Sequence, residues 1–403
     1  MTKGGAQGHA PGGSHLALGT RHFPFALTHF QTPVPHTLAT HRYLILAESH
    51  FGPLTSKTAN SAIRYLPERI VAVLDSTQAG RSVQDVLGFG GAIRVVGTIE
   101  EGLRGAPTAL LVGIAPQGGQ LPDSWRGVLA AAIAAGLDVV SGLHFYLGDD
   151  PELAALAERA GVEIHDLRKP PPGLPVAHGL ARNVEPLTVL TVGTDCNIGK
   201  MTAALQVRNA LRARGARVGF AATGQTGILI EGWGIAVDSV VADFIAGAAE
   251  RLVLQACDGN DIVLVEGQGS LVHPGYSGVT MGLVHGTLPD AMILCHLPSR
   301  IHPYGGNGAY SWMPLPPVPD AIRLCEAVVE PLKPSRVIAV SLNTWDLTDA
   351  QARDAIARTQ DETGLPATDP VRFDPAPLVD AVLAEQARKV ERRGGPTTAA
   401  AGG

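Results

Sequence analysis

Short apolar runs alternate with amphipathic stretches from Arg42 onward. The runs predict six strands, and the stretches between them predict helices over 57–66, 82–87, 124–135 and 152–160. The predicted strands are "YLILAES", "RIVAVLDS", "AIRVV", "ALLVGIA", "LDVVSG" and "VEIHDLR". Strands that alternate with helices indicate a parallel sheet with helices on both faces. Ligands of such sheets bind at the carboxyl ends of the strands.

A proline-rich segment, "RKPPPGLPVAHG", interrupts this pattern. Four prolines and two glycines among these twelve residues are typical of a linker. We therefore expect a first domain over 42–170, a linker over 171–185 and a second domain over 186–392.

The second domain repeats the alternation of strands and helices. Its predicted strands are "PLTVLTVG", "RVGFAAT", "DIVLVEGQG", "AMILCHLPS" and "RVIAVSLNTW". Helices are expected up to about Arg214 and over 240–257, 320–329, 349–363 and 376–392. The predicted fold class is α/β, with two domains that each contain a parallel sheet.

The two ends of the chain lack this periodicity. Residues 1–41 combine glycine, proline and threonine with six histidines, which are His9, His15, His22, His29, His36 and His41. We predict a disordered leader, with a metal-binding histidine tract as the alternative. Residues 393–403, rich in glycine and alanine, are predicted to be a disordered tail.

Composition narrows the possible partners. A net charge of -6 without a long basic block argues against a nucleic-acid partner. No run of about 18 apolar residues predicts a membrane span, and the first residues lack the layout of a secretory signal. The four cysteines are widely spaced, so neither a disulfide framework nor a structural zinc site is predicted from them. These features favour a cytoplasmic protein that binds small molecules.

The stretch "TVGTDCNIGKMTAAL", residues 191–205, has the layout of a phosphate-binding loop. An apolar strand ends at Gly193, and Gly199 and Lys200 open a helix. Backbone N–H groups and the helix N-terminus favour an anion there, and Lys200 adds a positive charge. The predicted phosphate-binding or cofactor-binding residues are Gly193, Thr194, Asp195, Cys196, Asn197, Gly199, Lys200, Met201 and Thr202.

The loop departs from the common pattern in two ways. Five residues instead of four separate its glycines, and Met201 follows the lysine where Ser or Thr normally ligates Mg²⁺. A thioether is a poor ligand for this hard cation. The substitution favours holding the phosphates of coenzyme A over cleaving ATP. ATP with magnesium stays the alternative, because Thr202 or a carboxylate offers another route to the metal.

The segments "GTDCNIGKMT" and "VEGQGS" resemble dethiobiotin synthetase, which has threonine directly after its lysine. The chain resembles the DgcN-like family more closely, from "AESHFGPLTSKTANSAIRY" through "SGLHFYLGDDPELAALAERAGVEIHDLR" to the phosphate loop. That family shares the pattern "GTDCxxGKMT". The resemblance implies a Rossmann-like N-terminal domain and a P-loop NTPase-like C-terminal domain. It also implies N-acetylation of D-glutamate by acetyl-CoA, a step of D-amino-acid catabolism.

Three residues are candidates for the base that an amine acceptor requires. Glu266 ends a buried strand, Asp243 lies in a helix segment shared with the family, and His273 lies in a glycine-rich loop. The alternatives are a carboxylate that holds a loop, a solvated helix face and a structural histidine. Cys196 is expected to have a lowered pKa because it lies near Lys200 and a helix N-terminus. An acyl-cysteine is nevertheless disfavoured, because direct attack by the amine needs no such step.

Polar residues at the strand ends are the candidates for holding the substrate. They are Thr223, Gln225, Thr226, Gln268, Ser270 and Arg300, where the arginine is suited to a carboxylate. Capped turns and a surface arginine are the alternatives. In the first domain, "AESHFGPLTSK" lacks the glycine pattern of NAD sites, although Ser56, Lys57 and Thr58 open a helix that suits an anion. Asp166 and Arg168 are expected to form an ion pair.

Three functions follow from these residues. The first is an acetyl-CoA-dependent N-acetyltransferase acting on an amino acid, with D-glutamate as the favoured acceptor. The second is an ATP-dependent and Mg²⁺-dependent ligase or kinase, and the third is a non-catalytic nucleotide-sensing or coenzyme-A-sensing protein. A homo-oligomer is expected by analogy, since related P-loop enzymes often complete their sites across dimers.

Overall fold

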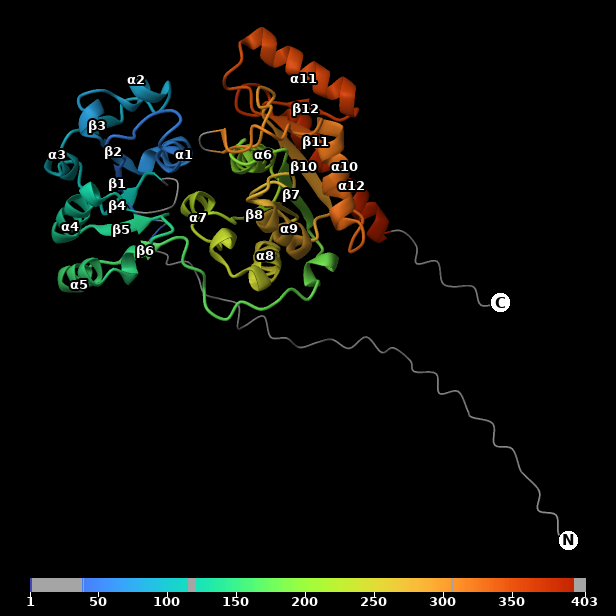
Figure 1. Ribbon diagram of the computed structural model, residues 1–403, viewed down its shortest axis with the longest axis horizontal. Helices are drawn as coiled ribbons and strands as arrows, with labels where there is room; N and C mark the ends of the chain where they lie inside the picture. The colour runs from blue at the N-terminus through green and yellow to red at the C-terminus, as the bar shows by residue number, and fades with distance from the viewer. Residues whose placement is uncertain (2–37, 39, 115–120, 306–307, 395–403) are drawn as a thin grey trace. The chain divides into compact units, whose positions relative to one another are not determined.

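The computed structural model describes residues 1, 38, 40–114, 121–305 and 308–394 (Figure 1). Most of the expected leader and nearly all of the expected tail lie outside these residues. The described residues from Leu38 onward belong to one compact unit. Within the described residues, no helix is both long and apolar enough to cross a membrane.

The first sheet is parallel, and its strand order is β3-β2-β1-β4-β5-β6. The strands are β1 (Tyr43–Leu46), β2 (Ile70–Leu74), β3 (Arg94–Val96), β4 (Ala109–Val112), β5 (Asp138–Ser141) and β6 (Ile164–Asp166). The helices are α1 (Lys57–Tyr65), α2 (Val83–Leu87), α3 (Ile99–Leu103), α4 (Arg126–Ala134) and α5 (Pro151–Ala160). This strand order is that of a Rossmann-like domain, and all six predicted strands are confirmed.

The second sheet is also parallel, in the order β12-β11-β10-β7-β9-β8. Its strands are β7 (Leu187–Gly193), β8 (Val218–Ala221), β9 (Ile262–Val265), β10 (Ala291–His296), β11 (Arg336–Leu342) and β12 (Ala367–Thr368). Its helices are α6 (Lys200–Ala213), α7 (Gln225–Glu231), α8 (Ala242–Ala256), α9 (Ser277–Thr287), α10 (Val318–Val329), α11 (Asp349–Thr363) and α12 (Ala376–Gly394). Every residue of β7 is buried, as a central strand requires.

Two helices near the second sheet, α7 and α9, were not predicted from the sequence. Helix α9 contains three glycines, which lower helix propensity. Two of them let α9 lie close against α8. A Cβ on Gly282 would lie 2.4 Å from Cγ2 of Ile245, and a Cβ on Gly286 would lie 2.1 Å from the carbonyl oxygen of Ala246. Tertiary packing therefore outweighs local propensity in α9.

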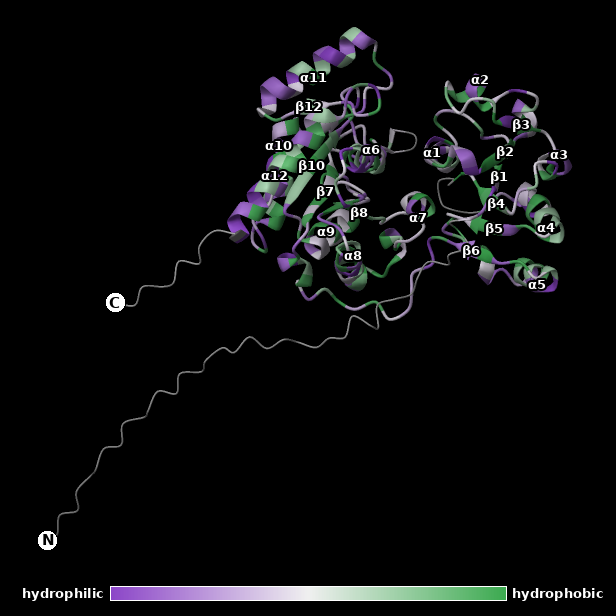
Figure 2. Cartoon of the chain, turned by 180° about the vertical axis from the view of Figure 1, so that it is seen from behind, coloured by the Kyte–Doolittle hydropathy of each residue, from purple (hydrophilic) through white to green (hydrophobic). Residues whose placement is uncertain are grey.

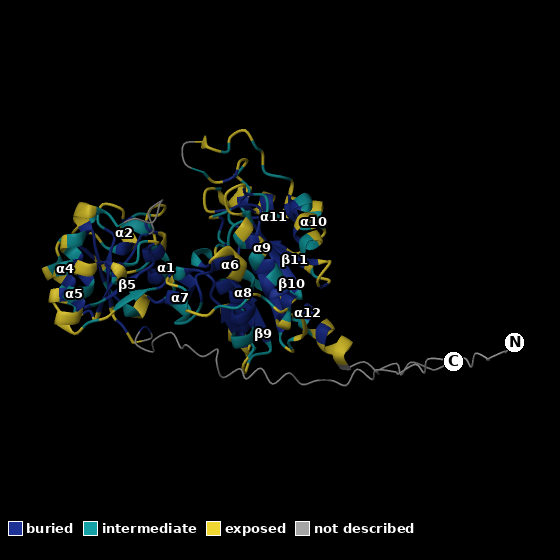
Figure 3. Ribbon diagram, turned by 60° about the horizontal axis from the view of Figure 1, so that its bottom comes forward, coloured by how far each residue is buried: buried dark blue, intermediate teal, exposed yellow. Residues whose placement is uncertain are grey.

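The core follows the two sheets. Hydrophobic residues concentrate on the strands (Figure 2), and the interior is buried while the outer faces of the helices are exposed (Figure 3). Helix α11 contributes little to this core, because only Ala352, Ala355 and Thr359 of its residues are buried. The sheets thus provide rigid supports for the loops at their carboxyl ends.

Candidate active site

The loop between β7 and α6 depends on the backbone freedom of two residues. Asn197 and Gly199 have φ values of 53° and 102°, in the left-handed region. A Cβ on Gly193 would lie 2.8 Å from Cδ1 of Ile198 and 3.3 Å from the carbonyl oxygen of Cys295, so a side chain there would require Ile198 to shift. The amide of Thr194 donates to the carbonyl of Cys295 on β10 at 3.1 Å. The loop is therefore held in one shape by its own residues and by the neighbouring strand.

Lys200 is the first residue of α6, and its side chain is directed into the loop. The residue is buried, and Nζ donates to the carbonyl oxygen of Asp195 at 2.7 Å. Burial lowers the pKa of Lys200 below its ordinary value. A bound phosphate would stabilise the ammonium in this position, as the phosphate-loop prediction requires.

Asp195 is the buried anion of the loop. Its Oδ2 accepts from Nη1 of Arg300 at 2.9 Å and from the amide of Tyr304 at 2.7 Å. The same Nη1 donates to the carbonyl of Cys196 at 2.9 Å. Oδ1 of Asp195 has no hydrogen-bond partner among the described residues. Arg300, expected to hold a substrate carboxylate, thus compensates the charge of Asp195 and fixes the loop.

Met201 and Thr202 differ in where their side chains lie. Met201 is 7% exposed and belongs to the hydrophobic core, whereas Thr202 is half-buried. The Met201 thioether therefore packs inside the domain, and only its backbone N–H remains suited to a phosphate.

Cys196 corrects one expectation from the sequence. Burial raises the pKa of its thiol to about 11, although the positive charge of Lys200 opposes the shift. The predicted lowering of this pKa is wrong, because the loss of hydration outweighs the attraction of the nearby cation. The thiol form is favoured at neutral pH, which argues further against an acyl-cysteine.

Glu266 follows β9 and is 5% exposed. Its Oε2 accepts from the amides of Thr223 at 3.0 Å and Gly224 at 3.1 Å. Burial raises the pKa of Glu266 to about 7, while these two hydrogen bonds and the charge of Lys57 act in the opposite direction. Glu266 can therefore change its protonation state near neutral pH, as a general base must.

The segment after Glu266 is tied to the phosphate loop. The amide of Gly267 donates to Oγ1 of Thr191 at 2.9 Å, and Oγ of Ser270 donates to the carbonyl of Gly193 at 2.8 Å. Nε2 of Gln268 donates to the carbonyl of Thr223. Gly267 is required because a Cβ would lie 1.6 Å from the carbonyl oxygen of Thr191. The structure thus brings Glu266, Gln268, Ser270 and Thr223 together beside the phosphate loop.

The start of α7 borders the same group of residues. Oγ1 of Thr226 is buried and has no hydrogen-bond partner among the described residues. Gln225 is half-buried and contacts Gly142, where a Cβ would lie 2.6 Å from Cγ of Gln225. The hydroxyl of Thr226 thus lacks a partner within the described part of the chain, while Gln225 packs against Gly142 of the first domain.

The other two candidate bases are placed differently. Asp243 is exposed in the first turn of α8, and no described residue forms an ion pair or hydrogen bond with its carboxylate. His273 is buried with both ring nitrogens engaged. Nδ1 accepts from the amide of Gly275 at 3.0 Å, and Nε2 lies 2.7 Å from the carbonyl of Tyr304. This geometry favours a structural His273 and leaves Glu266 as the best-placed base.

Lys57 is a residue whose role the sequence did not define. It opens α1, which packs against α7, and it makes no hydrogen bond or ion pair with another described residue. The side chain is open to solvent, but the surrounding protein removes part of its hydration and lowers its pKa, an effect that Glu266 opposes. Ser56 is instead buried and donates to the carbonyl of Gly52 at 2.9 Å. Lys57 thus remains the cation available near Glu266.

Arg168 also differs from its prediction. It pairs with Asp238 through Nη1, and its Nε donates to the carbonyl of Gly142 at 2.6 Å. Asp166 instead accepts from the amides of Leu147 and Gly148. The expected Asp166–Arg168 ion pair is therefore wrong, because backbone amides already satisfy Asp166.

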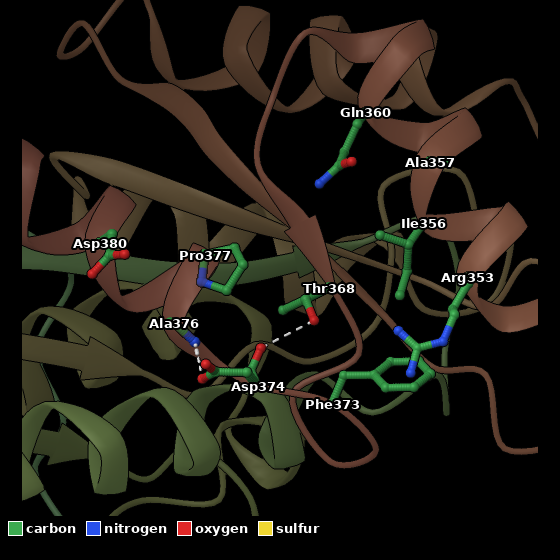
Figure 4. A pocket seen from close by; sticks show the side chains of 10 residues that line it. All are labelled: Arg353, Ile356, Ala357, Gln360, Thr368, Phe373, Asp374, Ala376, Pro377 and Asp380. Atoms are coloured by element: carbon green, nitrogen blue, oxygen red, sulfur yellow. Dashed lines mark hydrogen bonds between the residues drawn. The ribbon is translucent and has the colours of Figure 1, made fainter. Parts of the chain in front are cut away.

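A separate hollow of about 640 Å³ lies between α11, β12 and α12 (Figure 4). Its lining includes Arg353, Gln360, Thr368, Phe373, Asp374 and Asp380. None of these residues belongs to the phosphate loop or to the segment that follows β9. The hollow is therefore not the site formed around Lys200 and Glu266.

Known proteins resemble both domains of the chain. Residues 175–379 match the P-loop domain described as DUF1611_C, a domain of unknown function, and residues 76–170 match the Rossmann-like domain DUF1611_N. The crystal structure of a DUF1611 family protein from Anabaena variabilis has a TM-score of 0.81 and 41% identity, covering 85% of this chain and 99% of that one. These findings confirm the predicted fold class.

Two curated relatives carry the name D-glutamate N-acetyltransferase. The protein from Tritonibacter scottomollicae is 42% identical over 292 residues, which are 71% of this chain and 84% of the relative. The protein from a Pseudoalteromonas species is 38% identical over 269 residues, which are 66% of this chain and 79% of the relative. They confirm the resemblance inferred from the sequence motifs.

Proposed function

The chain belongs to the DUF1611 family, and from the activity for which two of its relatives are named we propose that it is an N-acetyltransferase that acts on D-glutamate. The acetyl donor in this proposal is acetyl-CoA. The observation that carries the proposal is a buried carboxylate, Glu266, with a pKa of about 7 beside a phosphate loop. A phosphate-binding loop suits the phosphates of the acetyl donor, and a base near neutral pH suits the deprotonation of the acceptor amine.

The phosphate loop suits the donor. Coenzyme A carries a pyrophosphate and a ribose phosphate, and its transfer reaction cleaves no phosphate bond. Lys200, the amides of the loop and the N-terminus of α6 would hold these phosphates. The core position of Met201 is consistent with a site that needs no metal-ligating hydroxyl after the lysine.

Glu266 is the proposed base. It accepts a proton from the ammonium of the acceptor, so that the neutral amine attacks the acetyl carbonyl. A bond forms between the amine nitrogen and the carbonyl carbon, the carbon–sulfur bond breaks, and the sulfur leaves with the electron pair. The nitrogen loses one proton as the amide forms, and the sulfur takes up one proton to give the free thiol. The amides of Thr223 and Gly224 fix the carboxylate for this role.

Lys57 is the proposed contact for a carboxylate of the acceptor. D-Glutamate carries two carboxylates, and a cation near the base that no other described residue pairs would orient the amine. Thr226 would add a hydroxyl from α7, since its Oγ1 is buried and unpartnered among the described residues.

An ATP-dependent ligase or kinase is the second candidate. Oδ1 of Asp195, which has no hydrogen-bond partner among the described residues, favours it, because a carboxylate oxygen suits a hydrated Mg²⁺. A non-catalytic nucleotide sensor or coenzyme A sensor would use the same loop without turnover. Assembly into a homo-oligomer, a cytoplasmic location and a role in D-amino-acid catabolism are further parts of the proposal.

Release of free thiol tests the function directly. Incubation with acetyl-CoA and a panel of D- and L-amino acids is expected to release coenzyme A with D-glutamate and little with L-glutamate. Mass spectrometry would identify N-acetylglutamate as the product. No thiol release with any amine would overturn the transferase, and amine-dependent formation of ADP from ATP and Mg²⁺ would favour the ligase.

A glycine in α7 provides a test of the geometry around Glu266. A Cβ on Gly227 would lie 2.2 Å from Oε2 of Glu266. Gly227→Ala is therefore expected to move the carboxylate off the two amides and to lower kcat/KM by about 100-fold. Gly278→Ala in α9 is the matched control, since a Cβ there meets nothing within 4 Å. Equal kinetics of the two variants would show that the position of Glu266 does not matter.

A further inference from the structure

Three potential metal ligands meet at the amino ends of β1 and β5. His41 precedes β1, Asp138 is the first residue of β5, and His165 lies on β6. One ligand atom from each lies within 4.8 Å of the others. This cluster belongs to the first sheet, whereas the phosphate loop follows β7 in the second.

The distances in the cluster suit coordination better than hydrogen bonding. Nε2 of His41 lies 3.6 Å from Oδ2 of Asp138, and Nε2 of His165 lies 3.5 Å from Oε2 of Glu163. Hydrogen bonds between nitrogen and oxygen span about 2.7–3.2 Å. The ligand atoms of a tetrahedral zinc, with bonds of about 2.0–2.2 Å, lie about 3.3–3.6 Å apart. The His41–Asp138 separation, which joins two members of the cluster, falls in the second range, and the His165–Glu163 separation is of the same size although Glu163 lies outside the cluster.

Burial leaves the two imidazoles in need of a partner. The side chains of His41 and His165 are 6% and 8% exposed. Nε2 of each ring is buried and has no hydrogen-bond partner among the described residues. Two buried ring nitrogens that lie in one cluster and have no hydrogen-bond partner among the described residues are unfavourable unless something binds them.

Other polar groups already orient two of the ligands. Nδ1 of His41 lies 3.1 Å from Oγ1 of Thr108. Oδ1 of Asp138 accepts from the amide of Glu163 at 2.7 Å. These contacts leave Nε2 of His41 and Oδ2 of Asp138 available to bind a metal. In known metal sites, hydrogen bonds to the ligating side chains orient them in the same way.

We propose that His41, Asp138 and His165 bind one Zn²⁺, with the carboxylate of Glu163 or a water molecule as the fourth ligand. Two imidazoles and a carboxylate favour a borderline cation such as Zn²⁺ over Mg²⁺ or Ca²⁺. The metal ties the segment that enters β1 to β5 and β6. The cysteine spacing, from which the sequence predicted no metal site, could not indicate these ligands.

Zinc content and thermal stability of the full chain test this site. Because the histidines upstream of residue 41 can also bind zinc, the reference is a chain with Gln at His9, His15, His22, His29 and His36. This reference is expected to retain one zinc per chain after dialysis and to lose thermal stability in a strong chelator. Replacing its zinc with Co²⁺ should give the visible absorption of a tetrahedral cobalt site.

His165→Gln and Asp138→Asn in the same background are expected to reduce the zinc content at least tenfold. Their Tm should no longer respond to the chelator. A reference chain that holds no zinc, even after incubation with Zn²⁺, would overturn the site whether or not the variants fold. Unchanged zinc content in a folded His165→Gln or Asp138→Asn chain would overturn this set of ligands.

Discussion

Glu266→Gln is expected to lower kcat by about 10²–10⁴-fold, the usual contribution of a general base. Glutamine matches glutamate in size, and its amide oxygen can still accept from Thr223 and Gly224. The backbone contacts of the loop are therefore retained, while the proton acceptor is lost. Steady-state kinetics with acetyl-CoA and D-glutamate measure the effect, and circular dichroism checks the fold.

The pH profile distinguishes a base from a merely structural carboxylate. Burial raises the pKa of Glu266 to about 7, so kcat/KM of the native enzyme should rise with pH through this value as the carboxylate forms. Glu266→Gln should lose this rise. An unchanged profile in the variant would assign the proton transfer to another group.

The contribution of Glu266 to the free energy of unfolding should fall as the pH rises, whereas kcat/KM should rise. The pKa of Glu266 is higher in the folded chain than its ordinary value of 4.5, so the folded state binds the proton more tightly than the unfolded chain. Its contribution to stability is fully present below about pH 4.5 and is lost as the pH rises toward 7. Glu266→Gln should therefore unfold at no lower a temperature than the native enzyme at pH 8.

Asp243→Asn is the comparison variant for Glu266→Gln. The sequence suggests both carboxylates as candidate bases. In the structure, Asp243 is exposed at the start of α8 and has no partner among the described residues. A loss of kcat as large as that of Glu266→Gln would transfer the catalytic role to Asp243. A small loss would leave Glu266 as the base.

The sequence predicts local features of the chain well. The strands of both sheets, except the two-residue β12, appear as apolar runs, because buried parallel strands need hydrophobic residues on both faces. The phosphate loop was recognised from Gly193, Gly199 and Lys200, because its shape depends on local backbone freedom. Glu266 could be placed at the end of a strand because it directly follows the apolar run Ile262–Val265.

Features that arise from tertiary contacts could not be predicted in this way. Helix α9 is stabilised by close packing against α8 despite its glycines. The pKa of Cys196 depends on burial, which no local pattern near Lys200 reveals. His41 and His165 belong to different parts of the sequence and meet only when β1, β4, β5 and β6 align.

The role inferred for Met201 from the sequence differs from its role in the structure. In the sequence it replaces a hydroxyl that normally ligates Mg²⁺. In the structure it is a core residue in the first turn of α6. Hydrophobic packing accounts for its presence there, and the hydroxyl nearest to the lysine along the chain becomes that of Thr202.

Lys200→Ala is expected to weaken the binding of coenzyme A by about 10–150-fold. This range corresponds to the loss of one charge-assisted hydrogen bond worth about 1.5–3 kcal/mol. The variant also removes the cation nearest to the buried Asp195 carbonyl, so the loop faces the phosphates with the amides and the helix N-terminus alone. Isothermal titration calorimetry with coenzyme A measures the change in Kd.

Lys169→Ala is the matched control for Lys200→Ala. Lys169 is exposed and pairs with Asp149 on the surface of the first domain, so its loss should leave the affinity for coenzyme A unchanged. Equal affinities of the two variants would remove the phosphate loop from the donor site. Loss of affinity for ATP with Mg²⁺ but not for coenzyme A would instead identify the loop as a nucleotide site. Since Arg300 already compensates Asp195, the charge of Lys200 remains available to the ligand, and its removal should act on binding more than on folding.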